Sequence, residues 1–163
     1  MRAEAALQTG DRFLLVGGGL TGVASLLHVA IILGGPDWYR FFGAGERMAH
    51  LAARGSIYPT IITSGIAVIL GVWTLYALSG ARAIRRLPFL RLALVLIAAI
   101  YLIRGTLGIP VVLLADDPYT NQLKVRMTFM FLSSAICICI GLCYAAGAAM
   151  VWRRSSARAL DTP

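Results

Sequence analysis

The stretch LALVLIAAIYLIRGTLGIPVVLLA covers residues 92–115 and contains a single charged side chain, that of Arg104. Such a long, almost uncharged run indicates the fold class. A helix needs about 20 apolar residues to cross the roughly 30 Å hydrocarbon core of a bilayer. Three further runs of similar length, residues 13–36, 57–79 and 127–152, contain no Asp, Glu, Lys or Arg. The sequence therefore predicts an all-α fold, an integral membrane four-helix bundle.

The overall composition excludes a soluble protein. Hydrophobic residues make up 59% of the 163 positions and charged residues only 13%, against about 25% charged residues in an average soluble domain. The length suits one domain, so residues 1–163 are predicted to form a single membrane domain. The net charge of +8 would suit nucleic acid, but the cations gather at the ends of the apolar runs. We expect membrane lipids as partners and no nucleic acid.

Proline and glycine mark the ends of the predicted helices. Gly34-Gly35-Pro36 is expected to end the first helix, because proline cannot continue the hydrogen-bond ladder. Pro88 suits the first turn of the third helix, and Pro110 predicts a kink within it. The predicted membrane helices cover residues 13–34, 57–79, 88–114 and 122–152, and an amphipathic segment covers residues 38–54.

The distribution of cations predicts the orientation. With the N-terminus inside the cell, nine cations lie on the inner side and five on the outer side. Because inner loops carry the excess of Lys and Arg, both termini are predicted to be cytoplasmic. The inner set is Arg2, Arg12, Arg82, Arg85, Arg86, Arg91, Arg153, Arg154 and Arg158, and the outer set is Arg40, Arg47, Arg54, Lys124 and Arg126.

The connection between the first two helices reads as an amphipathic helix on the outer membrane surface. Glu46 and His50 stand four positions apart, on one helical face. Three arginines recur at every seventh position, and we interpret them as contacts for lipid phosphates; they are Arg40, Arg47 and Arg54. Gly43 and Gly45 could break this helix and leave Arg40 outside the stripe.

A ligand pocket is predicted in the outer half of the bundle. His28 and Arg104 fall at similar depth when counted at 1.5 Å per residue, and Tyr101 lies beside Arg104 on the third helix. The amphipathic segment would place Glu46 and His50 over them as a lid. An arginine at the centre of a membrane helix costs about 2.5–3.5 kcal/mol, so Arg104 needs a partner.

Several partners and several simpler roles stay open. Arg104 could pair with Glu46, with Asp116 or Asp117, or with a bound anion or lipid headgroup. It could equally form a structural ion pair that holds the lid to the bundle. His28 could hydrogen-bond a backbone carbonyl of its own surroundings, and His50 could simply be solvated at the interface.

Three patterns carry no chemistry. Residues 17–22 match G-x-G-x-x-G, but a dinucleotide site needs a preceding strand and a later acid. The two histidines and Glu46 lack the H-E-x-x-H spacing of a zinc site. Three cysteines of the fourth run are interpreted as small packing residues; they are Cys137, Cys139 and Cys143. We therefore expect no metal and no cofactor.

Small residues predict close helix packing. Gly18 and Gly22 form G-x-x-x-G in the first helix. A second ridge in the fourth helix repeats every four residues, through Ala135, Cys139, Cys143 and Gly147. Contacts within one chain are favoured over a homodimer, because four helices are already available to pack.

The layout resembles the DoxX-like group of small four-helix bacterial inner-membrane proteins. The features that carry the resemblance are the helix end at Gly34-Gly35-Pro36, the aromatic and amphipathic segment after it, and an arginine in the third helix. Residues 34–48 also resemble a motif of uncharacterised proteobacterial membrane proteins. The resemblance implies a bacterial inner-membrane location and an accessory role beside redox systems, and it transfers no catalytic residues.

The leading functional hypothesis is a small binding or accessory membrane protein that holds a lipid, a small apolar molecule or a partner subunit. The alternative is an enzyme on a lipid-like substrate, in which Glu46 or His50 serves as acid or base and Arg104 stabilises negative charge. A small dimeric transporter is a third hypothesis, weakened because the four runs contain no carboxylate.

Overall fold

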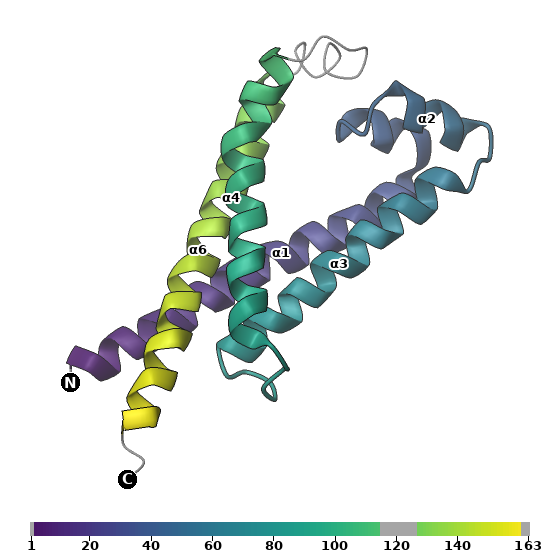
Figure 1. The fold of residues 1–163 in the computed structure, drawn as a ribbon. Helices are drawn as coiled ribbons and strands as arrows, with labels where there is room; N and C mark the ends of the chain where they lie inside the picture. The colour runs from purple at the N-terminus through teal and green to yellow at the C-terminus, as the bar shows by residue number, and fades with distance from the viewer. Residues whose placement is uncertain (1, 115–126, 161–163) are drawn as a thin grey trace.

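The computed structural model describes residues 2–114 and 127–160, and in these ranges every regular element is a helix (Figure 1). Four of the helices are long and apolar enough to cross a membrane, which confirms the predicted all-α fold with four membrane-length helices. The elements are α1 (Arg2–Phe41), α2 (Glu46–Ala53), α3 (Tyr58–Gly80), α4 (Leu90–Leu114) and α6 (Met127–Leu160).

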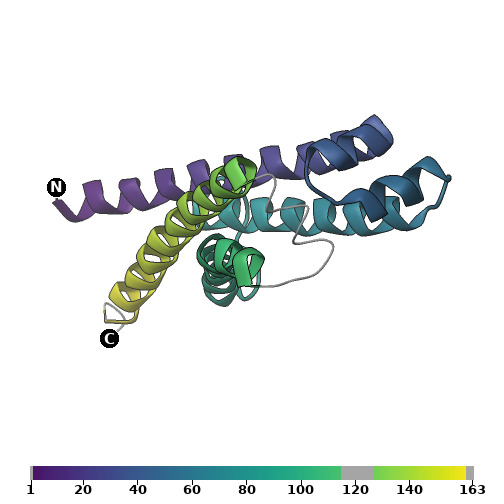
Figure 2. The ribbon, with the colours of Figure 1, turned by 90° about the horizontal axis from the view of Figure 1, so that it is seen from above.

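The long helices form two pairs. Helix α1 packs along α3, and α4 packs along α6. Figure 1 shows the two pairs crossing toward the end that holds both termini and diverging toward the end that carries α2. Figure 2 shows α2 lying against the α1–α3 pair, away from the α4–α6 pair. The two helix pairs therefore diverge from one crossing, and only the α1–α3 pair carries the amphipathic helix α2.

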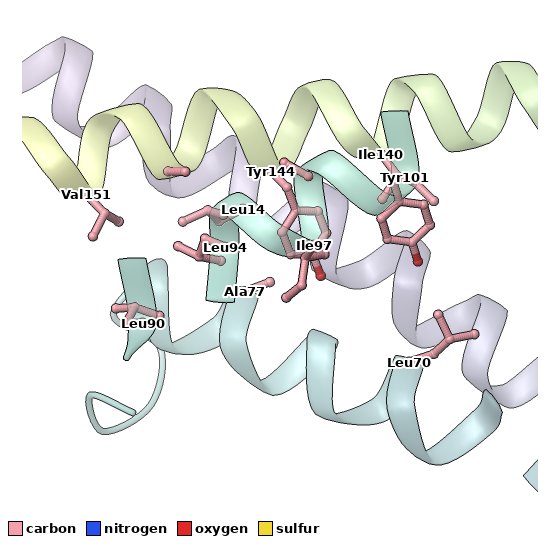
Figure 3. Packing of buried hydrophobic residues seen from close by; sticks show 12 residues of the cluster. Leu14, Leu70, Ala77, Leu90, Leu94, Ile97, Tyr101, Ile140, Tyr144 and Val151 are labelled. Carbon is pink, nitrogen blue, oxygen red and sulfur yellow. The ribbon is translucent and has the colours of Figure 1, made fainter. Parts of the chain in front are cut away.

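The core lies at this crossing (Figure 3). Glycines let the backbones approach there: a side-chain carbon at Gly80 would lie 2.7 Å from Leu14, and one at Gly147 would lie 2.3 Å from the same leucine. Leu14 of α1 thus fills the space that two glycines of α3 and α6 leave free. The largest buried apolar side chains around it include Leu94, Ile97, Ile140 and Tyr144.

Helix α1 is longer than predicted at both ends, because it begins at Arg2 instead of residue 13 and resumes after a break near its other end. Gly35 has a non-helical conformation with φ 69° and ψ −152°, which glycine adopts readily. Pro36 then stands at the first position of a renewed helical turn, where its missing N–H is harmless, and the helix reaches Phe41. The predicted break at Gly34-Gly35-Pro36 is thus a kink rather than a helix end.

The segment predicted as one amphipathic helix over residues 38–54 is divided in two. Gly43 has φ 75° and Gly45 has φ 91°, so the chain leaves helical geometry between α1 and α2. Arg40 belongs to the kinked end of α1, and α2 carries Arg47, with Arg54 directly after it. Arg47 and Arg54 of the predicted stripe therefore lie on α2 and at its C-cap, and Arg40 stands apart.

The connection between α3 and α4 is held by one hydroxyl. Ser79 Oγ donates to the carbonyl of Arg85 (3.1 Å) and accepts from the N–H of Leu87 (2.9 Å). Helix α4 begins at Leu90, two residues later than predicted, because Phe89 has φ 52°. It continues through Pro110 to Leu114.

Helix α6 extends past its predicted end at residue 152 and reaches Leu160. Arginines favour helix almost as strongly as alanine, so Arg153 and Arg154 continue the helix rather than ending it. The predicted first residues of this helix, 122–126, lie outside the described residues, as do Asp116 and Asp117.

Candidate functional site

A buried polar and aromatic cluster occupies the crossing and draws one side chain from each long helix. Thr21 of α1 is fully buried. The Tyr101 hydroxyl of α4 lies 3.2 Å from Thr21 Oγ1, and the Tyr144 hydroxyl of α6 lies 3.4 Å from the same oxygen. The Tyr144 hydroxyl also lies 3.0 Å from the carbonyl oxygen of Trp73 on α3. All four membrane helices therefore meet at one small network.

Each hydroxyl hydrogen of this cluster has an acceptor. Thr21 donates to the Gly17 carbonyl at 2.8 Å, which leaves its oxygen free to accept from Tyr101. Tyr144 donates to the Trp73 carbonyl, the shorter of its two contacts. A satisfied network is what a buried polar cluster requires in a medium without water.

Aromatic rings enclose these hydroxyls. The rings of Trp73 and Tyr101 meet edge to face with centroids 5.3 Å apart, and those of Tyr101 and Tyr144 stack at 6.0 Å. Figure 3 shows Tyr101 and Tyr144 between the helices at the crossing. Since every polar atom is paired and the rings fill the surrounding space, we assign this cluster to holding the helices together rather than to binding a ligand.

The predicted pocket residue His28 turns back to its own helix. Its Nδ1 lies 2.7 Å from the Ala24 carbonyl, and its side chain is half-buried. Tyr101 reaches α1 at Thr21, two helical turns before His28. The geometry matches the simpler role for His28, a hydrogen bond to a backbone carbonyl.

Glu46 and His50 belong to a surface cluster at the junction of α1 and α2. Glu46 Oε2 lies 3.1 Å from Arg40 Nε and 3.6 Å from His50 Nε2. Arg40 Nη1 also binds Asp37 at 3.0 Å. No hydrogen bond or ion pair among the described residues joins Glu46 or His50 to Arg104. Glu46 of the predicted lid therefore pairs with Arg40 of α1 and not with Arg104.

A neighbouring face of α2 anchors this helix to α1. Ala49 is fully buried and packs in a cluster with Ile31 and Tyr39. Arg47 and Arg54 are exposed, so they stay available for the predicted contacts with lipid phosphates. Helix α2 is therefore a docked amphipathic element of the α1–α3 pair.

Arg104 lies near the middle of α4, three residues beyond Tyr101 and hence on a neighbouring part of the same side. It is exposed. Its guanidinium reaches one turn toward the α2 end: a side-chain carbon at Gly108 would lie 2.2 Å from Arg104 Nη1. None of the described residues forms an ion pair or hydrogen bond with it.

Sequence analysis did not single out three buried polar positions. Thr21, Tyr144 and Ser134 are short or single polar side chains inside apolar runs, and all three are buried. A polar residue inside a membrane run is a usable signal, because it needs a partner there. Sequence alone could have marked these positions, although helix rotation decides which of them meet.

A second ionic cluster joins α1, α6 and the α3–α4 connection. Asp11 of α1 binds Arg154 of α6, with 2.7 Å between Oδ1 and Nη1. Its other oxygen binds Arg82 of the α3–α4 connection. The Asp11 and Arg154 side chains are only 14% and 16% exposed. One carboxylate therefore joins three segments at the end opposite α2.

Comparison with protein families, curated proteins and solved structures finds no match. Within residues 2–114 and 127–160, no three His, Cys, Asp or Glu side chains gather closely enough to ligate a metal ion. The feature of the structure that bears on function is therefore the position of Arg104 and its surroundings.

Proposed function

We propose that this protein is a small binding or accessory membrane protein that holds a lipid-like molecule beside Arg104, on the α2 side of the helix crossing. The observation that carries the proposal is the position of Arg104. It is a permanent cation near the middle of a membrane-length helix, and no described residue neutralises it.

The energy of a charge in lipid supports a bound partner. A helix-central arginine costs about 2.5–3.5 kcal/mol, and intramembrane cations usually pair with an anion or line a ligand path. Glu46, one of the carboxylates predicted as its partner, binds Arg40 instead. An amphipathic ligand with a polar head would supply the missing partner.

Apolar side chains around Arg104 fit the tail of such a ligand. Ile100, Leu107 and Val111 stand at positions −4, +3 and +7 from Arg104, so they share its side of α4. They are 48%, 52% and 56% exposed. These residues and Arg104 form what we call the Arg104 stripe, one cation within a row of exposed apolar side chains.

The orientation completes the proposal. We place both termini in the cytoplasm and α2 on the outer face of a bacterial inner membrane. Support comes from the surplus of arginine around the termini and the α3–α4 connection, and from the layout that resembles the DoxX-like group. Alkaline phosphatase fused after residue 163 should stay inactive in cells, and fused after Gly55 it should be active; the reverse pattern would overturn this orientation.

Native mass spectrometry of the protein released from nanodiscs tests the binding function. Wild-type protein should keep at least one lipid, and Arg104→Met should keep about tenfold less. Arg85→Met, an exposed residue of the α3–α4 connection, is the matched control and should match the wild type. Bare wild-type protein under conditions that preserve its fold would overturn the proposal.

A further inference from the structure

Ser134 of α6 has a buried hydroxyl without a partner. The residue is 2% exposed, and its Oγ makes no hydrogen bond. Its neighbour Ser133 differs, because Ser133 Oγ donates to the Met130 carbonyl at 3.1 Å. Leaving a buried hydroxyl unsatisfied costs about 1–3 kcal/mol, so the Ser134 hydroxyl calls for a ligand or another specific explanation.

The Arg104 guanidinium lies next to this hydroxyl. A side-chain carbon at Gly108 would lie 2.2 Å from Arg104 Nη1 and 3.4 Å from Ser134 Oγ. Both groups therefore lie close to Gly108, and the Arg104 guanidinium occupies the space that a side chain at residue 108 would fill. The side chain of Arg104 reaches toward the C-terminal end of α4, against the usual lean of helical side chains toward the N-terminus.

This spot lies within reach of lipid headgroups. Gly108 is six residues beyond Leu102, the middle residue of α4, or about 9 Å along the helix axis. Half of the hydrocarbon core is about 15 Å thick. To reach Gly108, a headgroup would thus have to move about 6 Å below the surface of the hydrocarbon core. Its acyl chains could lie along the exposed Arg104 stripe of the same helix.

The two groups suit one class of anion. A guanidinium binds the two non-bridging oxygens of a phosphodiester in parallel, and each of these oxygens can accept a further hydrogen bond from a serine hydroxyl. We propose that the lipid held beside Arg104 is an anionic phospholipid, whose phosphate binds Arg104 and Ser134 beside Gly108. This inference rests on the proposed function and names the ligand's headgroup. The acyl chains then lie along Ile100, Leu107 and Val111 of the Arg104 stripe.

The experiment uses nanodiscs of equimolar phosphatidylglycerol and phosphatidylethanolamine, with retained lipid identified by mass and protein stability measured in parallel. The wild type should keep mainly phosphatidylglycerol. Ser134→Ala should lower its retention about tenfold, since a hydrogen bond to a charged group is lost. In lipid-stripped protein the same variant should keep or gain thermal stability, because there it removes an unsatisfied hydroxyl. Ser133→Ala is the matched control and should retain phosphatidylglycerol as the wild type does.

A second variant keeps both polar groups and places a side-chain carbon where the Arg104 guanidinium lies. Gly108→Ala should displace the guanidinium and also lower retention, whereas Gly19→Ala, where an added carbon meets nothing within 4 Å, should not. Equal retention of both lipids, or full retention by Ser134→Ala and Gly108→Ala, would overturn the headgroup assignment and leave the binding function standing. No retained lipid in the wild type would overturn the binding function itself.

Two further arms identify other anions. Retention of inorganic phosphate or a fatty acid by lipid-stripped protein, lost in Arg104→Met and competing with phosphatidylglycerol, would overturn the phospholipid in favour of that anion. Energetic coupling between Arg104→Met and the Asp116→Asn, Asp117→Asn double variant would overturn it in favour of an internal ion pair.

Discussion

The Tyr101 hydroxyl donates to Thr21 Oγ1 across 3.2 Å and joins residues 80 positions apart. Thr21 belongs to the α1–α3 pair and Tyr101 to the α4–α6 pair, so this bond fastens one pair to the other. Tyr144 does the same through the Trp73 carbonyl. Because lipid supplies no hydrophobic drive between helices, hydrogen bonds and close packing carry such contacts.

Thr21→Val should destabilise the protein by about 1–2 kcal/mol. Valine keeps the shape of threonine but removes the acceptor, so the Tyr101 hydroxyl is left unpaired in a buried site. Adding Tyr101→Phe should recover part of this loss, since the orphaned hydroxyl disappears. Unfolding of the wild type, the two single variants and the double variant in mixed detergent micelles gives the coupling energy. Additive losses would show that the two residues do not interact.

Gly18→Ala should separate α1 from α3. The added carbon would lie 2.7 Å from the Ala77 side chain, which is short and has no room to move. Overpacking of this kind costs about 1–3 kcal/mol. Gly19→Ala introduces the same atom where nothing lies within 4 Å, so it should be neutral or slightly stabilising. A similar loss of thermal stability in both variants would contradict the packing described for Gly18.

The predicted small-residue motifs differ in how they are used. Gly18 and Gly22 of the G-x-x-x-G face Ala77 and Thr74 of α3, so this motif packs within the chain. In the fourth-helix ridge, Cys143 lies against Gly17 of α1, whereas Cys139 is exposed. A repeat shows which residues share a face, but the crossing angle decides how far along it two helices touch.

The predicted site shows the same limit. Length and apolarity of the runs sufficed for the four membrane helices, because the bilayer sets both. They did not indicate that the helices separate into two diverging pairs, which places Glu46 beside Arg40 instead of Arg104. Side-chain partners depend on helix rotation and pairing, and one sequence does not determine either.

Ala49→Leu should release α2 from α1. Ala49 is fully buried against a cluster that includes Ile31 and Tyr39, so three added carbons must displace the helix. Ala53→Leu places the same side chain at an exposed position of α2 and should leave the helix docked. Hydrogen exchange of the α2 amides should rise at least tenfold in Ala49→Leu only. Unchanged protection in both variants would rule out docking through Ala49.

Asp11→Asn should lower the free energy of unfolding by about 1–3 kcal/mol. Asparagine keeps the shape but removes the charge that binds Arg154, a largely buried cation, and losing one partner of a buried pair costs about 3–5 kcal/mol. The smaller figure reflects the asparagine side chain, whose amide oxygen can still accept a hydrogen bond from Arg154.

Asp37→Asn is the matched control, because the Asp37 side chain is 90% exposed in its ion pair with Arg40. Its expected cost is about 0–1 kcal/mol. Both variants are compared by detergent unfolding at low and high salt. The Asp11 effect should persist at high salt, since buried pairs are weakly screened. If Asp11→Asn loses no more stability than Asp37→Asn, the carboxylate does not hold the two helix pairs together, and the contacts at the helix crossing must do so.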